Sequence, residues 1–153
     1  MLPCNVGVSF EPRTTRTMRY LAIDYGLQRT GLAMCDVQET IVSPYRVLEG
    51  KDRLCERIAS IVRAESVESV VVGLPLNMDD SEGPQAKAVR RFVRQLSAHL
   101  AIPIVLHDER LSSFSAQEKL ADVDLTAAKK RRHLDAIAAA EILQAFLDRD
   151  RRP

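Results

Sequence analysis

Residues 19–36, RYLAIDYGLQRTGLAMCD, decide the fold of this chain. The stretch begins with a compact apolar strand, RYLAID (19–24), passes through a glycine-containing turn, DYGLQRTG (24–31), and returns as a second strand, TGLAMCD (30–36). Two apolar runs joined in this way are typical of an antiparallel pair. SPYRVLE (43–49) follows with the pattern of a third strand. The sequence therefore predicts an antiparallel three-strand meander at the start of the domain.

Helices and strands alternate in the remainder of the chain. The expected order is a helix at 51–65, a strand at 69–73, a loop at 74–84, a helix at 85–100, a strand at 102–109, a helical stretch at 112–122 and a last helix that begins at Leu134 or Asp135. The fully apolar SVVVG (69–73) is of the kind found in buried parallel strands. The predicted fold class is α/β: a five-stranded mixed sheet, with the meander plus two parallel strands, and helices on both faces.

A single domain fits the length of 153 residues. Residues 1–17 contain two prolines and no sustained periodicity, so we expect a flexible N-terminal extension, with Met18 as a possible true start, followed by the domain at 18–150. The alternative is an ordered arm that packs through Val6, Val8 and Phe10.

Composition excludes several classes of protein. The chain is 46% hydrophobic and 28% charged with a formal net charge of +1, so overall charge does not mark it as a nucleic-acid binder. Its three cysteines are an odd set without metal-ligand spacing, which argues against a disulfide framework or a zinc site. The apolar runs are too short to cross a bilayer, and no signal peptide is evident. We expect a cytoplasmic protein with no membrane partner.

Three acidic residues lie at the ends of elements that should be buried: Asp24 and Glu109 end strands, and Asp135 lies at the start of the last helix. Ionised carboxylates are costly to bury unless they are paired or bind a cation, so this arrangement predicts a metal site. If strand alternation continues, Glu109 shares a face with His107, whereas Asp108 points the other way.

Each carboxylate also has a simpler explanation. Asp24 could cap its own turn, Glu109 could pair with Arg110, and Asp135 could be an N-cap or a first-turn acid. Capping, however, does not require the buried side of a helix. On a helical wheel Asp135 shares its face with apolar side chains, namely Ala138, Ala139, Ile142 and Phe146.

Three carboxylates are hard oxygen ligands, which suit Mg²⁺ or Mn²⁺ better than Zn²⁺. Such ions activate water and stabilise both the attacking and the leaving oxygen in phosphoryl transfer. No convincing nucleophile with a paired base is present, which argues against covalent catalysis. The sequence therefore favours hydrolysis of a phosphodiester bond.

Two groups of basic residues are candidates for contacts with a phosphate backbone. On the helix at 85–100 the cations share the face opposite the apolar residues, and they are Lys87, Arg90, Arg91 and Arg94. The second group, KKRRH at 129–133, precedes Asp135 and contains Lys129, Lys130, Arg131 and Arg132. A solvated outer face explains the first group equally well. Repulsion within the second group favours an anionic partner, so there we favour nucleic acid.

Four segments, in this order, carry a resemblance to a known family: LAIDYGLQRTGLAMCD, VVGLPLNMDDSEGPQA, DERLSS and LDAIAAAEIL. They resemble the YqgF/RuvX family, which is related to the Holliday-junction resolvase RuvC within the ribonuclease H-like fold. The resemblance covers about residues 20–147. It implies a five-stranded mixed sheet, a divalent-metal site and nuclease activity in maturation of the 5′ end of 16S ribosomal RNA or, in some members, on branched DNA. By motif position Asp24, Glu109 and Asp135 match the three acidic residues of the family. Arg110, Ser112 and Ser113 in DERLSS are further candidates for nucleic-acid contacts.

Two departures limit the transfer of function from the family. Asp80 stands where the loop usually carries glycine, although Asp tolerates left-handed backbone angles. Resolvases of the RuvC type carry a second acid three residues after the helix Asp, and here that position is Ala138. A weaker metal site, a water in place of the ligand, or reduced activity are the expected alternatives.

Two other functional classes remain open from the sequence. DYGLQRTG resembles the first phosphate loop of sugar kinases and actin-like ATPases, but one short chain cannot supply the second domain that closes on ATP. A non-catalytic RNA-binding module needs no metal. The chain would be a monomer or a homodimer, and symmetric cutting by a resolvase would require the dimer.

Overall fold

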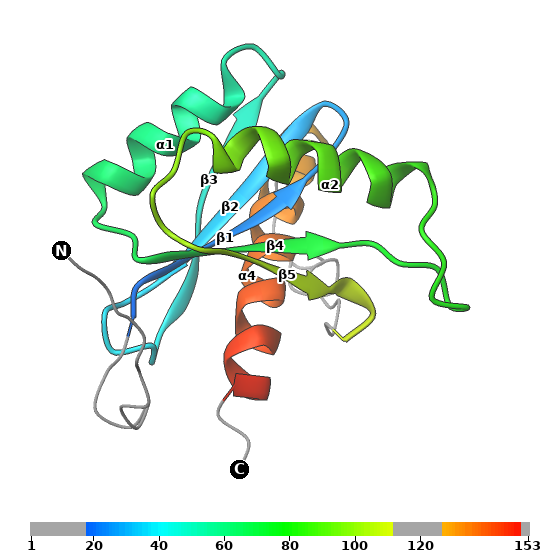
Figure 1. The fold of residues 1–153 in the computed structure, drawn as a ribbon. Coiled ribbons are helices and arrows are strands. Elements are labelled where there is room, and N and C mark those ends of the chain that lie inside the picture. Colours follow the sequence, from blue (N-terminus) through cyan, green and yellow to red (C-terminus); the bar gives the residue numbers. More distant parts are fainter. Residues whose placement is uncertain (1–17, 112–126, 151–153) are drawn as a thin grey trace, which may run out of the picture.

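A five-stranded mixed sheet forms the centre of the molecule, in the strand order β3-β2-β1-β4-β5 (Figure 1). The computed structural model describes residues 18–111 and 127–150, so the expected N-terminal extension and the helical stretch at 112–122 lie outside the described residues. The strands are β1 (Tyr20–Tyr25), β2 (Arg29–Cys35), β3 (Val42–Glu49), β4 (Ser69–Leu74) and β5 (Ile104–Asp108). β1, β2 and β3 pair antiparallel, whereas β4 runs parallel to both β1 and β5. The predicted meander with two added parallel strands is confirmed.

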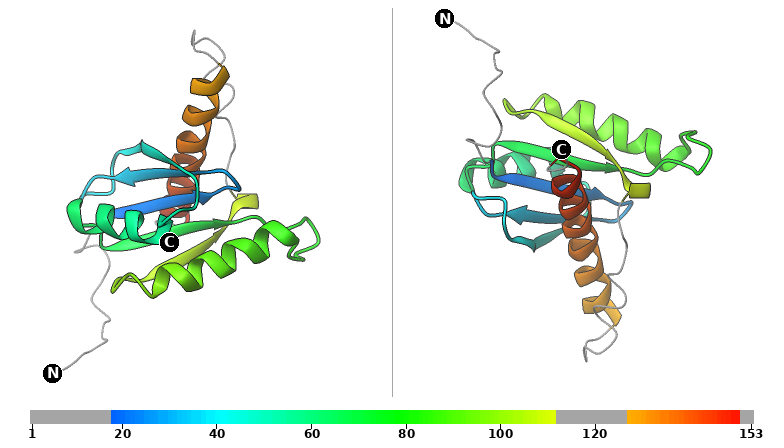
Figure 2. Two further views of the ribbon diagram at one scale, coloured as in Figure 1. Left: turned by 90° about the horizontal axis from the view of Figure 1, so that it is seen from above. Right: turned by 90° about the horizontal axis from the view of Figure 1, so that it is seen from below.

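Helices cover both faces of this sheet, as predicted (Figure 2). α1 (Leu54–Ala64) and α2 (Pro84–Ser97) lie on one face, and α4 (Ala127–Asp150) crosses the other. Alternation along β1 divides the core between the two faces, because Ile23 packs on the α1 and α2 side while Ala22 packs on the α4 side. Within the described residues, none of the helices has the length and apolar character needed to span a membrane.

α2 begins at Pro84, directly after the extended residue Gly83. Gly83 is extended, and Pro84 follows at the first helical position, where its missing N–H costs nothing. Val89, Phe92 and Leu96 are buried against the sheet, in agreement with the predicted apolar face. The helix ends at Ser97, three residues before the predicted end.

α4 begins at Ala127, so the prediction that the last helix begins at Leu134 or Asp135 is wrong. The segment AAKKRRHL (127–134) contains neither Gly nor Pro, and Ala, Lys and Arg are strong helix formers, so the helix extends upstream of the apolar face. Asp135 is therefore neither an N-cap nor a first-turn residue, and that explanation of its position is excluded. Figure 2 shows the first turns of α4 projecting beyond the edge of the sheet.

Candidate metal centre

Asp24 lies near the carboxyl end of β1, on the face of the sheet that α4 covers. Alternation places it on the same side as Ala22, and its partner across the strand pair is Gly31 of β2. The turn after β1 closes through the Gly26 N–H, which donates to the Arg29 carbonyl oxygen at 3.0 Å. Within the described part of the chain the Asp24 side chain has no hydrogen bond or ion pair, so it does not cap this turn.

Glu109 follows β5 as the first residue of the short 3-10 helix η3 (Glu109–Leu111). Its side chain lies over Gly73 of β4, where an added Cβ would come within 2.9 Å of the Glu109 Cγ. Gly73 therefore leaves the space that the glutamate occupies. His107 is buried on this same side against Phe146 of α4, whereas Asp108 turns away and pairs with Arg110 at 2.6 Å. The predicted division of the two acids between opposite faces is confirmed.

Asp135 reaches the site because α4 lies directly on β2. A Cβ at Gly31 would collide with the backbone carbonyl of Asp135, so the glycine permits the helix to approach. The Asp135 carboxylate accepts a hydrogen bond from the Arg29 Nε at 2.6 Å, between two side chains that are each 28% exposed. Further along the helix the buried side chains are Ala136, Ala139, Ile142, Leu143 and Leu147.

Burial and neighbouring carboxylates raise the pKa values of Asp24 and Glu109. Burial, followed by the charge of Asp135, raises the pKa of Asp24 from 3.8 to about 6. Burial, followed by the charges of Asp24 and Asp108, raises the pKa of Glu109 from 4.5 to about 7. Asp24 is thus the acid that interacts with both of the others. Partly buried carboxyls with raised pKa values and no cationic partner are typical of functional sites.

The donor set fits a hard divalent cation, because it consists of carboxylate oxygens alone. The carboxylates are neighbours without forming a closed cage: among the described residues no three potential ligands are close enough to hold an ion together. Arg29 holds one oxygen of Asp135, while Asp24 and Glu109 have no cation beside them in the part of the chain that the structure describes. The residues present therefore match the chemistry of the predicted site, although the described side chains do not converge on one point.

Comparison with known proteins identifies the family of the chain. The model of the RuvX family, described as Holliday junction resolvase, matches residues 18–149. The chain belongs to the RuvX family.

Relatives in this family cover almost the whole domain. A protein from Anaeromyxobacter sp. (strain K) that carries the name "Putative pre-16S rRNA nuclease" is 44% identical over 136 residues, which cover 86% of this chain and 98% of the relative. A protein of the same name from Methylocella silvestris is 39% identical over 155 residues, covering 99% of this chain and 90% of the relative. Members of the RuvX family with this name thus share the full length of the domain.

Solved structures with the same fold include RuvC from Thermus thermophilus. RuvC in complex with a Holliday junction substrate matches with a TM-score of 0.56 at 16% identity, covering 88% of this chain and 96% of RuvC. The fowlpox virus Holliday junction resolvase matches with a TM-score of 0.52 at 10% identity, covering 86% of this chain and 99% of that protein. At these identities the likeness shows the fold, and the expected ribonuclease H-like architecture of this RuvX-family chain is confirmed.

The basic side chains of α2 do not lie beside the carboxylates. Lys87, Arg90, Arg91 and Arg94 are exposed on α2, which covers the opposite face of the sheet, and Arg90 pairs with Glu82 at 2.6 Å. The second basic group, at 129–132, lies in the first turns of α4, and its side chains are outside the described residues, as are Ser112 and Ser113. Asp24 therefore interacts through its charge with both of the other carboxylates, and the basic face of α2 lies across the sheet from them.

Arg110 fastens the loop between β4 and α2 beside the site. It pairs with Asp80 at 2.8 Å as well as with Asp108, and it donates to the carbonyl oxygen of Asn77 at 2.9 Å. Asp80 adopts the left-handed conformation with φ of 70°, as its position in a glycine site predicts. Arg110 therefore does not pair with Glu109, and its predicted contact with nucleic acid would compete with these bonds.

The sequence analysis missed Arg29, which the structure places in contact with a predicted ligand. Its only local signal is a basic residue just before Gly31, in the turn that follows Asp24.

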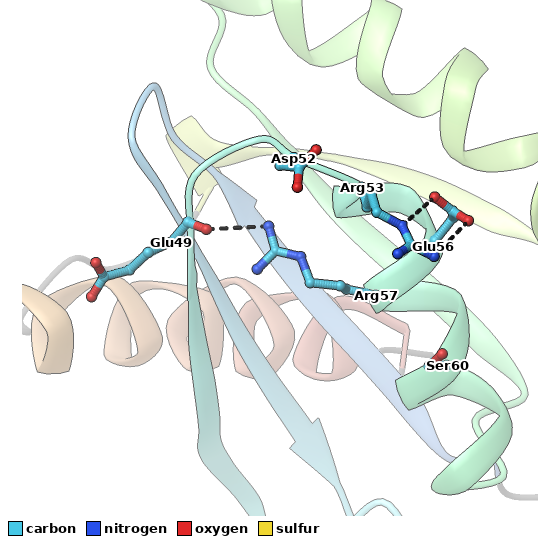
Figure 3. Close-up of a pocket in the computed structure, with 6 residues that line it drawn as sticks. All are labelled: Glu49, Asp52, Arg53, Glu56, Arg57 and Ser60. Carbon is cyan, nitrogen blue, oxygen red and sulfur yellow. Dashed lines mark hydrogen bonds and ion pairs between the residues drawn. The ribbon is translucent and has the colours of Figure 1, made fainter.

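A separate hollow lies at the start of α1, lined by Glu49, Asp52, Arg53, Glu56, Arg57 and Ser60 (Figure 3). There Arg53 pairs with Glu56 and Arg57 donates to the Glu49 carbonyl oxygen, so neither cation offers an open phosphate site.

Proposed function

We propose that this chain is a divalent-metal-dependent nuclease that hydrolyses phosphodiester bonds in maturation of the 5′ end of precursor 16S ribosomal RNA. The observation that carries the proposal is that Asp24 interacts through its charge with both Asp135 and Glu109, while Asp24 and Glu109 are desolvated and have no cation beside them among the described residues. The names of the relatives at 44% and 39% identity support the choice of RNA substrate. A cytoplasmic location fits this substrate.

Asp24, Glu109 and Asp135 would hold Mg²⁺ or Mn²⁺ through their carboxylate oxygens. The bound ion supplies activation of water and stabilisation of the charged phosphate oxygens. The three carboxylates would hold the cation at the end of the sheet, and Asp24 and Glu109, whose pKa values are raised, would have to be ionised to do so. In the reaction a water oxygen bonds to phosphorus, one P–O ester bond breaks, and the leaving oxygen takes up a proton.

The polyanionic substrate needs contacts beyond the metal centre, and two basic groups are candidates to supply them. Residues 129–132 lie in the part of α4 that projects past the sheet (Figure 2). Lys87, Arg91 and Arg94 are exposed on the far face, where a folded RNA could reach them. Phosphate contacts of this kind fix position without reading sequence. Neutralising Lys129 to Arg132 should weaken RNA binding and reduce its salt dependence.

Holliday junction DNA is the alternative substrate, which the description of the family model favours. Ala138 weighs against it, because the second helix acid of the RuvC type is absent there. A homodimer would be needed for paired cuts in a junction, whereas a monomer suffices to trim RNA.

Cleavage of a 16S precursor RNA and of a four-way DNA junction, assayed side by side with Mn²⁺ and with chelator, tests the proposal. The expected result is metal-dependent cleavage of the RNA, with Asp24→Ala inactive but still able to bind RNA. Cleavage of the junction alone would replace the RNA proposal with the resolvase. If neither substrate is cut but RNA binds, the chain is a binding module. ATP hydrolysis lost in Asp24→Asn, without nuclease activity, would favour the ATPase-like class.

A further inference from the structure

Arg29 is a cation at the edge of the candidate metal centre. Its backbone is fixed twice, by the turn that Gly26 closes and by pairing of β2 with Glu49 of β3. Its Nε donates to the Asp135 Oδ2 at 2.6 Å across 106 positions of sequence. The guanidinium therefore has a defined position beside the carboxylates.

The donors of this guanidinium are mostly unused. Arginine has five N–H donors in a planar fork, and among the described residues Arg29 spends only the Nε on a partner. The four N–H groups on the two Nη atoms remain. With its side chain 28% exposed, Arg29 keeps this edge within reach of a ligand from solvent.

The charge balance of the site indicates that the free Nη edge of Arg29 would bind a phosphodiester. Three ionised carboxylates and Arg29 sum to −2, which one divalent cation cancels. A phosphodiester that enters the site then brings one further negative charge, and its two non-bridging oxygens match the spacing of guanidinium donors.

We propose that Arg29 is a further catalytic residue of this site, whose Nη groups bind the non-bridging oxygens of the scissile phosphate while its Nε holds Asp135. This inference rests on the proposed nuclease function and adds a residue to it. The competing explanation is an ion pair that only fastens α4 to β2. In that case Arg29 would act on stability and on the orientation of Asp135, without touching substrate.

Arg19 provides a matched control for Arg29. It forms an ion pair with Glu65 at 3.3 Å, with side chains 30% and 31% exposed, next to the other end of β1. Arg19→Ala thus removes a cation and an ion pair of similar exposure away from the carboxylates. Any effect specific to the reaction should appear in Arg29→Ala alone.

The experiment compares wild type, Arg29→Ala, Arg29→Lys and Arg19→Ala for RNA cleavage and for the rise in melting temperature that Mn²⁺ causes. Arg29→Ala should lose about 100-fold or more in kcat, the usual effect of removing one preorganised donor. Its Mn²⁺-induced rise should be at least as large as that of wild type, because the site has become more negative. Millimolar guanidinium should restore part of its activity. Arg29→Lys should stay folded and cleave more slowly than wild type, since an ammonium cannot form the planar fork.

Several results would overturn the role of Arg29. The proposed phosphate contact is refuted if Arg29→Ala cleaves as fast as Arg19→Ala. It is also refuted if Arg29→Lys cleaves as fast as wild type. If Arg29→Ala loses both the Mn²⁺-induced rise in melting temperature and the cleavage activity, and guanidinium does not restore the activity, then Arg29 acts only through Asp135. If wild type and Arg19→Ala also fail to cleave, the proposed nuclease function itself falls.

Discussion

Replacing Asp24 with asparagine should make the metal-free protein more stable while abolishing cleavage. Asparagine has nearly the same shape as aspartate and removes only the charge. That charge is unfavourable in the metal-free fold because burial and the neighbouring Asp135 raise the pKa of Asp24 from 3.8 to about 6. The site is thus expected to sacrifice stability for the capacity to bind a cation.

The magnitude and the sign follow from linkage between proton binding and folding. With an unfolded pKa near 3.8 and a folded pKa of about 6, the folded state holds more protons in this window, so stability falls as pH rises through it. Above the window the ionised Asp24 costs up to about 3 kcal/mol. Glu109, with a folded pKa of about 7, extends the loss to higher pH. Because the charge of Asp24 is one of the causes that raise the pKa of Glu109, the costs of the two acids do not add.

Thermal unfolding at about pH 5 and about pH 8, in chelator and in Mn²⁺, measures this effect. Wild type in chelator should melt lower at the higher pH and recover when Mn²⁺ is added. Asp24→Asn should melt several degrees higher than wild type at about pH 8 in chelator, since 1 kcal/mol corresponds to about 2–4 °C in a chain of this size. It should also lose most of the rise that Mn²⁺ gives wild type.

Asp52→Asn serves as the control, because Asp52 is an exposed carboxylate away from the site. It should leave both the pH dependence and the Mn²⁺ response unchanged. Asp24→Asn that is less stable than wild type at the higher pH in chelator would refute the reasoning, since Asp24 would then be favourably placed without a metal.

Three further substitutions test other parts of the structure. Gly31→Ala should lower the free energy of unfolding in urea by about 1–3 kcal/mol, because its Cβ would collide with the Asp135 carbonyl; unchanged stability would contradict the close approach of α4. Asp80→Asn keeps a residue that tolerates positive φ but removes the ion pair with Arg110. The loop between β4 and α2 should therefore exchange its amide hydrogens faster than in wild type. Exchange at the wild-type rate would show that the ion pair does not fasten the loop. Ala138→Asp should destabilise the metal-free protein and enlarge the Mn²⁺-induced rise in melting temperature; no change in that rise would show that position 138 does not face the metal.

The fold was predictable because its signals are local. RYLAID and SVVVG are short apolar strands bounded by turn residues, and the helix at 84–97 has a clear apolar face, so element type and order follow from the pattern. The positions of Asp24 and Glu109 followed from the same logic, since strand ends on one face of a sheet come together. The start of α4 was not predictable from its apolar face, because helix propensity alone extends it upstream to Ala127.

Contacts between distant residues account for what the sequence could not predict. The Arg29 to Asp135 pair spans 106 positions, and only the approach of α4 at Gly31 brings the two together. Arg110 follows Glu109 directly, yet it pairs with Asp80 because the loop before α2 folds back toward it. Both pairs depend on the tertiary path of the chain, which periodicity does not encode.

Mapping of the 5′ ends produced from a 16S precursor RNA by wild type, Glu109→Gln and Glu56→Gln in Mn²⁺ tests the central claim most directly. Glu56 is an exposed glutamate on α1 and serves as the matched control. The account predicts one new 5′ end with wild type and with Glu56→Gln, lost with Glu109→Gln and with chelator. Cleavage by Glu109→Gln at the wild-type rate would contradict it.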